Sequence, residues 1–225
     1  MLGRKALFRL SFFLLLIASV AYSTWLLRGW LNPQMSILDS FSSELAAVGQ
    51  PFNWVFRLGD ATTAIIVGVV AFLWWKVRAC GWLIPLTLGL FSLSTIADVL
   101  FPMACSTALS QACRIAEASH SLGIAHDLHV VTSVSANVTS MFFVGWALLR
   151  YRRGLVVPWI GAAQLAITAL SGVTAAYEIP GFGIVQRLST VLLVAWWIGF
   201  GWQIVRRGGI RPAQLRRLVV RGSQI

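Results

Sequence analysis

The chain has 225 residues, of which 58% are hydrophobic and 11% charged, and its net charge is +11. This composition excludes a water-soluble domain of this size. Apolar runs of about 20 residues have the length needed to cross the hydrocarbon of a membrane. Six such runs occur, at residues 6–31, 54–75, 81–101, 124–149, 155–177 and 184–205. We therefore expect an all-α integral membrane six-helix bundle that forms a single transmembrane domain over residues 1–225.

The basic residues are divided unequally between the two sides of this bundle. One side receives 14 of the 18, which are Arg4, Lys5, Arg9, Lys76, Arg78, Arg150, Arg152, Arg153, Arg206, Arg207, Arg211, Arg216, Arg217 and Arg221. All seven acidic residues and all three histidines lie on the other side. The positive-inside rule then places both termini in the cytoplasm. We expect the basic tail, residues 206–225, to lie on anionic headgroups of the inner leaflet rather than on nucleic acid.

The first apolar run has a second interpretation. Arg4 and Lys5, the apolar stretch and the small residues near Ala21–Ser23 also resemble a secretory signal. The run is long for the apolar region of a signal, and its removal would place the new N-terminus outside. We predict an uncleaved first span, with a cleaved signal as the alternative.

The first outer link, Asn32–Asn53, is about 22 residues long. Within it Ile37, Phe41, Leu45 and Val48 recur at helical spacing. A stretch of this kind predicts a short amphipathic helix that lies on the outer membrane surface.

The second outer link, Pro102–Gly123, contains Cys105 and Cys113. Because extracytoplasmic compartments are oxidising, we predict a disulfide between them, with two free thiols as the alternative. Such a bond would hold this link over the outer mouth of the bundle.

Four ionisable residues lie within the predicted spans at a similar depth, near the outer interface: Asp60, Asp98, His126 and His129. An ionisable residue inside a membrane is costly, so each one suggests a functional site. His126 and His129 are three positions apart and share a helical face, which Ser133, Asn137 and Ser140 continue. We weigh three interpretations of these residues.

In the first interpretation they form a metal site. His126, His129 and Asp98 would bind zinc, with Asp60 or His120 as further donors, and the zinc would lower the pKa of a bound water to about 7.

In the second interpretation they belong to a structural charge network, which would pair Arg57 with Asp60, and Arg187 with Asp98. In the third interpretation they recognise a polar headgroup or take part in a proton-coupled step, in which the acids and His126 titrate.

Three stretches resemble the DUF998 family of bacterial and archaeal membrane proteins. They are SSELAAVGQPFNWVFRLGD (Ser42–Asp60), ADVLFPMAC (Ala97–Cys105) and GFGIVQRLSTVLLVAWW (Gly181–Trp197). The resemblance implies a six-span bundle in a bacterial cytoplasmic (inner) membrane and supplies no reaction. The chain departs from the family at Met103 and Ala104, since members often have an acid soon after the Phe-Pro pair. The positions that match family motifs are Ser43, Glu44, Asp60, Asp98, Phe101, Pro102, His126, Gln186 and Arg187.

Two functions are therefore considered. One is a non-enzymatic, lipid-binding or accessory membrane protein with an outward-facing polar pocket, whose protein partners stay unknown. The other is a metal-dependent hydrolase of a lipid ester or amide. In the hydrolase the catalytic or metal-binding residues would be Asp60, Asp98, His126 and His129. The ligand-binding residues would be Glu44, Arg57, Gln186 and Arg187, with an arginine on an anionic headgroup.

Overall fold

The computed structural model describes residues 3–151 and 158–209, so most of the predicted basic tail lies outside the described residues. In this part of the chain, six helical segments are long and apolar enough to cross a membrane. They consist of α1 (Arg4–Ala21) continued by η1 (Thr24–Leu27) and α2 (Arg28–Leu31), then α3 (Asn53–Lys76), α4 (Leu83–Leu100), α6 (Ile124–Tyr151), α7 (Pro158–Ala176) and α8 (Phe182–Arg207). Two short helices lie in the links, η2 (Ser42–Ala46) and α5 (Gln111–Ala118). The predicted all-α six-helix membrane bundle is confirmed.

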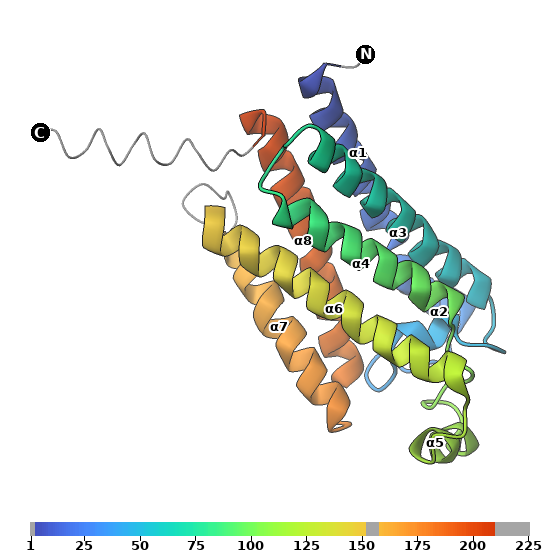
Figure 1. Ribbon diagram of the computed structural model, residues 1–225. Helices are drawn as coiled ribbons and strands as arrows, with labels where there is room; N and C mark the ends of the chain where they lie inside the picture. The colour runs from blue at the N-terminus through green and yellow to red at the C-terminus, as the bar shows by residue number, and fades with distance from the viewer. Residues whose placement is uncertain (1–2, 152–157, 210–225) are drawn as a thin grey trace, which may run out of the picture.

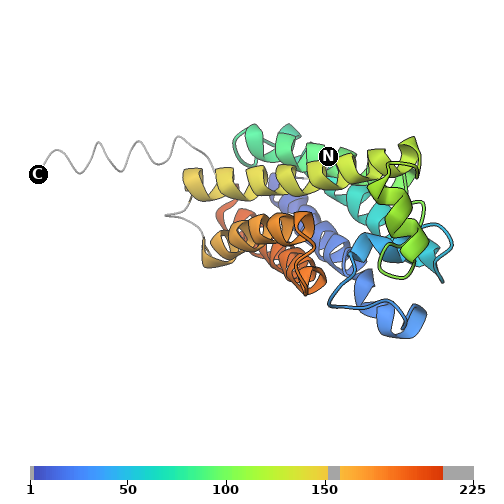
Figure 2. The ribbon, with the colours of Figure 1, turned by 90° about the horizontal axis from the view of Figure 1, so that it is seen from below.

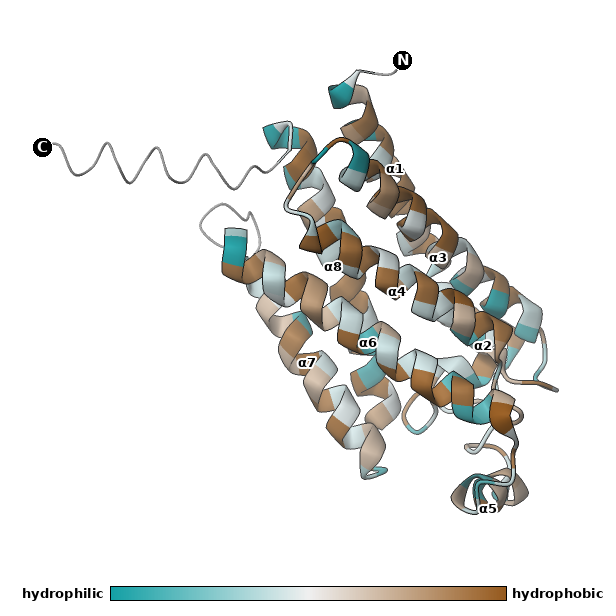
Figure 3. Cartoon of the chain, in the orientation of Figure 1, coloured by the Kyte–Doolittle hydropathy of each residue, from teal (hydrophilic) through white to brown (hydrophobic). Residues whose placement is uncertain are grey.

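The long helices form a closed ring in the order of the sequence (Figure 1). Each packs against the long helices before and after it, and α1 also packs against α8. Figures 1 and 2 show that the C-terminal end of α6 and the N-terminal end of α7 lie close together and that the two helices diverge toward their other ends. Figure 3 shows hydrophobic residues along the ring helices and hydrophilic residues at helix ends.

Both described ends of the chain lie at the same end of this ring, which we call the termini end. A guanidinium N–H of Arg4 donates to the carbonyl of Arg78 at 3.4 Å, in the link between α3 and α4. Gly209 lies against the same link, because a Cβ on it would be 3.1 Å from the carbonyl oxygen of Ala79. The opposite end carries α5 and is called the α5 end (Figure 1). The compartment that each end faces stays a prediction.

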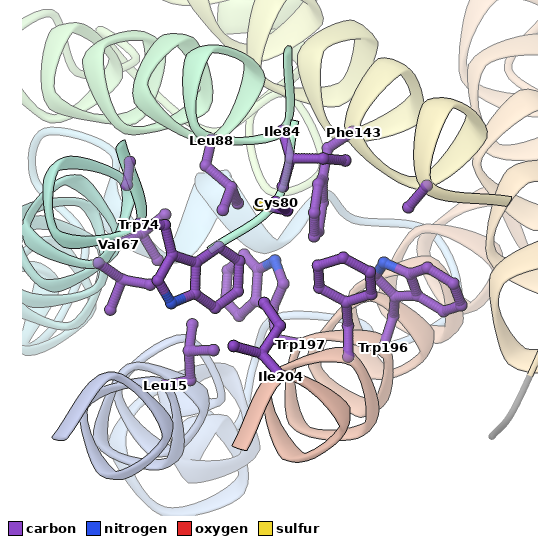
Figure 4. Packing of buried hydrophobic residues seen from close by; sticks show 14 of the residues in the cluster. Leu15, Val67, Trp74, Cys80, Ile84, Leu88, Phe143, Trp196, Trp197 and Ile204 are labelled. Atoms are coloured by element: carbon purple, nitrogen blue, oxygen red, sulfur yellow. The ribbon is translucent and has the colours of Figure 1, made fainter. Parts of the chain in front are cut away.

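Aromatic side chains fill the centre of the ring toward the termini end (Figure 4). Trp196 stacks on Phe200 at 5.8 Å between ring centroids, and Phe143 meets Phe200 edge-on at 5.6 Å. Gly161 makes room for Trp196, since a Cβ there would lie 2.5 Å from the indole. Small residues of this kind let membrane helices approach closely. The filled half leaves the α5 end as the place where a cavity can form.

The amphipathic surface helix predicted from Ile37 to Val48 is wrong. The only helical turn within that range is the 3-10 helix η2, and the rest of the range is irregular. Leu45 is fully buried, in a small cluster with Met35 and Phe56. The link folds inward because its polar groups bond to the second link and to α8, which holds Met35 and Leu45 against protein. Leu38 and Val48 of the same link stay exposed.

Candidate functional site

A cavity of about 90 Å³ lies between the helices at the α5 end. One water molecule needs about 10–15 Å³ on this scale, so the cavity has room for several waters or for one small polar group. The spans α3, α4, α6 and α8 supply polar lining residues, among them Asp60, Asp98, Asn137 and Gln186. Ser42, at the start of η2, contributes from the first link. Ionisable residues on two different spans therefore meet at one hollow.

Asp98 is the centre of a hydrogen-bond network that joins α4 to α6. Its Oδ1 accepts from the hydroxyls of Thr132 at 2.9 Å and Ser133 at 2.6 Å. Nδ1 of His129 lies 3.2 Å from the same oxygen and 3.0 Å from the carbonyl oxygen of Phe101. Because both neighbours are acceptors, Nδ1 carries a ring hydrogen. Residues 129, 132 and 133 share one helical face, so one carboxylate can hold all three.

Ser133, His129 and Asp98 also have the composition of a serine-hydrolase triad. The hydroxyl oxygen of Ser133 lies 3.4 Å from Nε2 of His129, against 2.6 Å from the carboxylate. The hydroxyl therefore donates to Asp98 in this arrangement, whereas acyl transfer requires the histidine to accept that proton. As described, the three side chains tie two helices together.

His126 has a different set of partners from His129. Its Nε2 lies 3.1 Å from Oε1 of Glu117 on α5, and the N–H of Ala104 donates to its Nδ1 at 3.4 Å. Nε2 therefore carries the ring hydrogen, and the pair attaches the second link to the start of α6. His120 is exposed in the link that follows α5.

The donors predicted for zinc do not converge. Within residues 3–151 and 158–209, no group of three or more His, Cys, Asp or Glu side chains is placed to hold a metal ion. His129 and Asp98 face each other, whereas His126 faces Glu117. The set of His126, His129 and Asp98 therefore does not fit a three-ligand zinc site.

Glu44 was predicted to bind a ligand, and the structure places it outside the cavity lining. It is fully buried in η2. Oε1 accepts from the N–H of Ala108 at 2.8 Å and from the hydroxyls of Ser106 and Thr107 at 3.0 and 3.1 Å. Oε2 accepts from the N–H of Phe41 at 2.8 Å. Glu44 thus fastens the two long links to each other.

Arg187 and Gln186 fasten the first link to α8. Nη1 of Arg187 donates to the carbonyls of Ile37 and Ser40 at 3.0 and 2.7 Å. Oε1 of Gln186 accepts from the N–H of Ser42 at 2.8 Å, and Gln186 also lines the cavity. Of these two predicted ligand-binding residues, only Gln186 reaches the cavity.

The predicted ion pairs of Arg57 with Asp60 and of Arg187 with Asp98 are wrong. Arg57 donates to the carbonyl of Val99 at 3.0 Å, and Arg187 donates to link carbonyls. Among the described residues, the basic side chains found within 4.0 Å of a carboxylate are those of His126 and His129. The carbonyls at the end of α4 and in the first link lack helical partners, and they attract the guanidinium groups in place of the aspartates.

The predicted disulfide between Cys105 and Cys113 is confirmed, with Cα atoms 6.1 Å apart. It closes the second link onto α5, whose first turn is capped by the Ser110 hydroxyl accepting from the Cys113 N–H. The remaining cysteine, Cys80, is buried between α3 and α4, and this burial raises the pKa of its thiol. A buried thiol of this kind is unreactive.

Residues 15–203 match a family model described as "Protein of unknown function (DUF998)". The chain belongs to the DUF998 family. No curated protein and no solved structure matches it. The matched segment of this multi-pass DUF998 protein runs from within α1 into the last turns of α8, and it includes every residue that lines the cavity.

Three aromatic residues of the DUF998 cavity were missed from the sequence: Tyr22, Trp25 and Phe56. Aromatic residues near span ends usually anchor a helix at the membrane interface, so they carried no signal of a site. The one available signal was local. Tyr22 and Trp25 lie where α1 stops and the chain turns through η1, and residues at such breaks can face the bundle interior.

Proposed function

We propose that this DUF998 protein is a non-enzymatic lipid-binding protein, and that its cavity takes the polar headgroup of a membrane lipid. The α5 end would face the outside of a bacterial cytoplasmic membrane, as the distribution of basic residues predicts. The observation that carries the proposal is the position of the cavity, which lies between membrane-spanning helices and reaches the flank of the bundle.

Access from the flank is supported by Asn137. This residue of α6 lines the cavity and is also exposed. Its neighbours Val134 and Val138 are 57% and 42% exposed, so this flank of α6 is an apolar, lipid-facing surface. A lipid could keep its tails on that surface while its headgroup enters the polar hollow.

The first link supports a binding role by forming a fixed cover at the α5 end. Ser42 and Ser43 of this link line the cavity. Ser42 is held by Gln186, and the adjacent Glu44 is held by the second link. A rigid cover of this kind presents hydroxyl groups to a ligand without an ordering step.

The test is the retention of native lipid by purified protein, measured by native mass spectrometry and lipid extraction. Ala136→Leu would add bulk inside the cavity, because Ala136 is buried and lines it. Ala169→Leu is a matched control on an exposed position of α7. We expect the native protein and Ala169→Leu to retain stoichiometric lipid and Ala136→Leu to lose it. Equal retention by both variants, or no lipid on the native protein, would refute the proposal.

A lipid hydrolase is the second candidate, and the contact of Ser133, His129 and Asp98 beside the cavity favours it. A small rotation of the Ser133 hydroxyl toward Nε2 of His129 would produce the order of contacts that acyl transfer needs. A hydrolase of this kind predicts covalent labelling of Ser133 by a fluorophosphonate, abolished in Ser133→Ala. A binding protein predicts no labelling.

A further inference from the structure

The cavity is lined by two carboxyl groups and has no basic side chain among its described lining residues. Asp60 and Asp98 line it, and no lysine or arginine does so among the described residues. Asp98 already has the hydroxyl and imidazole partners described above. Asp60 has no hydrogen bond or ion pair in residues 3–151 and 158–209. A carboxylate within a membrane is costly unless a cation, a proton or hydrogen-bond donors compensate it.

Aromatic rings form part of the same lining. Tyr22 comes from the end of α1, Trp25 from η1 and Phe56 from α3. Tyr22 is held in position by ring contacts to Phe91 and Trp197, at 5.9 and 5.6 Å between centroids. The faces of aromatic rings attract cations, and cages of such rings recognise ammonium groups.

Two basic residues directly follow lining residues in sequence, Arg57 after Phe56 and Arg187 after Gln186, and both are already engaged. Arg57 donates to the Val99 carbonyl, and Arg187 donates to the first link while its guanidinium lies 5.9 Å from the ring of Trp25. Neither lines the cavity, so its interior offers no charged donor for a phosphate group. The arrangement therefore selects against an anion and favours a cation.

We infer that the cavity binds an ammonium group, either a protonated primary amine or a quaternary ammonium, with Asp60 as counter-ion and Tyr22, Trp25 and Phe56 as aromatic walls. The inference rests on the proposed function in one respect, namely that the ammonium belongs to a lipid headgroup. The hollow of about 90 Å³ accommodates the amine end of a headgroup, and the phosphate of that lipid would stay at the rim.

The experiment uses the full-length protein in nanodiscs of phosphatidylglycerol. One arm adds phosphatidylethanolamine to the bilayer, and a second adds soluble ethanolamine or tetramethylammonium. Binding is measured as the rise in melting temperature and as the change in tryptophan fluorescence. Asp60→Asn removes the counter-ion, and Asp127→Asn is the matched control because Asp127 is exposed in the first turn of α6. A second variant, Trp25→Leu, removes one aromatic wall.

We expect the amine-bearing lipid to stabilise the native protein and Asp127→Asn. The apparent affinity should fall at least tenfold in Asp60→Asn and less steeply in Trp25→Leu. Equal binding by the native protein and Asp60→Asn would overturn the inference, and so would a preference for phosphatidylglycerol over phosphatidylethanolamine.

The two proposals can fail separately. If Ala136→Leu loses a lipid that carries no amine, the lipid-binding function stands and the ammonium inference falls. If only the soluble amines bind, the ammonium site is supported and the proposal that the ammonium belongs to a lipid headgroup is refuted.

Discussion

Replacement of Glu44 by glutamine tests whether this residue joins the two long links or serves a ligand. The variant keeps the size of the side chain and removes its charge. The two carboxylate oxygens accept four hydrogen bonds, two of them from the backbone N–H groups of Phe41 and Ala108. A glutamine has one oxygen, so its NH2 group must face at least one of these N–H donors.

The size of the effect follows from that count. We expect the oxygen to keep the three donors at the Oε1 position, which leaves the Phe41 N–H buried without an acceptor, at a cost of about 1–3 kcal/mol. The three remaining bonds lose their charge assistance, at about 1 kcal/mol each. The total is about 4–6 kcal/mol, which corresponds to an increase of about a thousandfold or more in the opening of the joined links.

Hydrogen–deuterium exchange measured by mass spectrometry can detect this opening. Peptides that cover residues 35–48 and 103–118 should exchange faster in Glu44→Gln, while peptides from α8 keep their protection. Asp39→Asn is the matched control, because Asp39 is exposed and accepts one N–H, from Gly181, that an asparagine oxygen can also accept. Unchanged exchange of both link peptides in Glu44→Gln would show that Glu44 does not join them.

Three further predictions concern stability and metal content. Gly183→Ala should lower the free energy of unfolding by about 1–3 kcal/mol through overpacking, and the melting temperature with it. The reason is that a Cβ there would lie 2.5–2.8 Å from three carbonyl oxygens of the first link. Gly172→Ala is the control, because a Cβ there has nothing within 4 Å, and equal melting temperatures of the two variants would contradict the prediction. Cys105→Ser should destabilise the second link by about 2–3 kcal/mol, since the disulfide closes a short loop of sequence separation 8. Unchanged proteolysis of that link would argue against this prediction. Elemental analysis of the purified protein should show no stoichiometric zinc, and a melting temperature that rises with added zinc would refute the geometry given for the histidines.

The apolar runs predicted the bundle well because hydrophobic length alone decides whether a helix can cross a membrane. The interruption at Ala21 was not foreseen, since Leu26, Leu27 and Trp30 extend the run without a Pro or Gly signal before Gly29. The disulfide was also predictable, because only two cysteines share one link. The membrane spans depend on local composition, and the disulfide depends on the redox state of the compartment that its link faces.

The partners of the charged residues were not predictable by the same reasoning. Helical spacing placed His129 and Ser133 on one face, and the structure brings both to Asp98. Spacing could not reveal that Arg57 and Arg187 bond to backbone carbonyls, because those carbonyls belong to the end of α4 and to an irregular link. A carbonyl without a helical partner leaves no trace in the residue type, and so the sequence favoured the aspartates as partners.

The closed ring of helices has a consequence for how the chain can be cut and joined. Neighbours in space are also neighbours in sequence, and the ring is completed by the contact of α1 with α8, near which Arg4 and Gly209 lie together. A circular permutation that links these two ends and opens the chain beside α5 would preserve the packing of every adjacent pair. The order in which the helices enter the bilayer would change while the native contacts stayed the same, which separates the influence of insertion order from that of final packing.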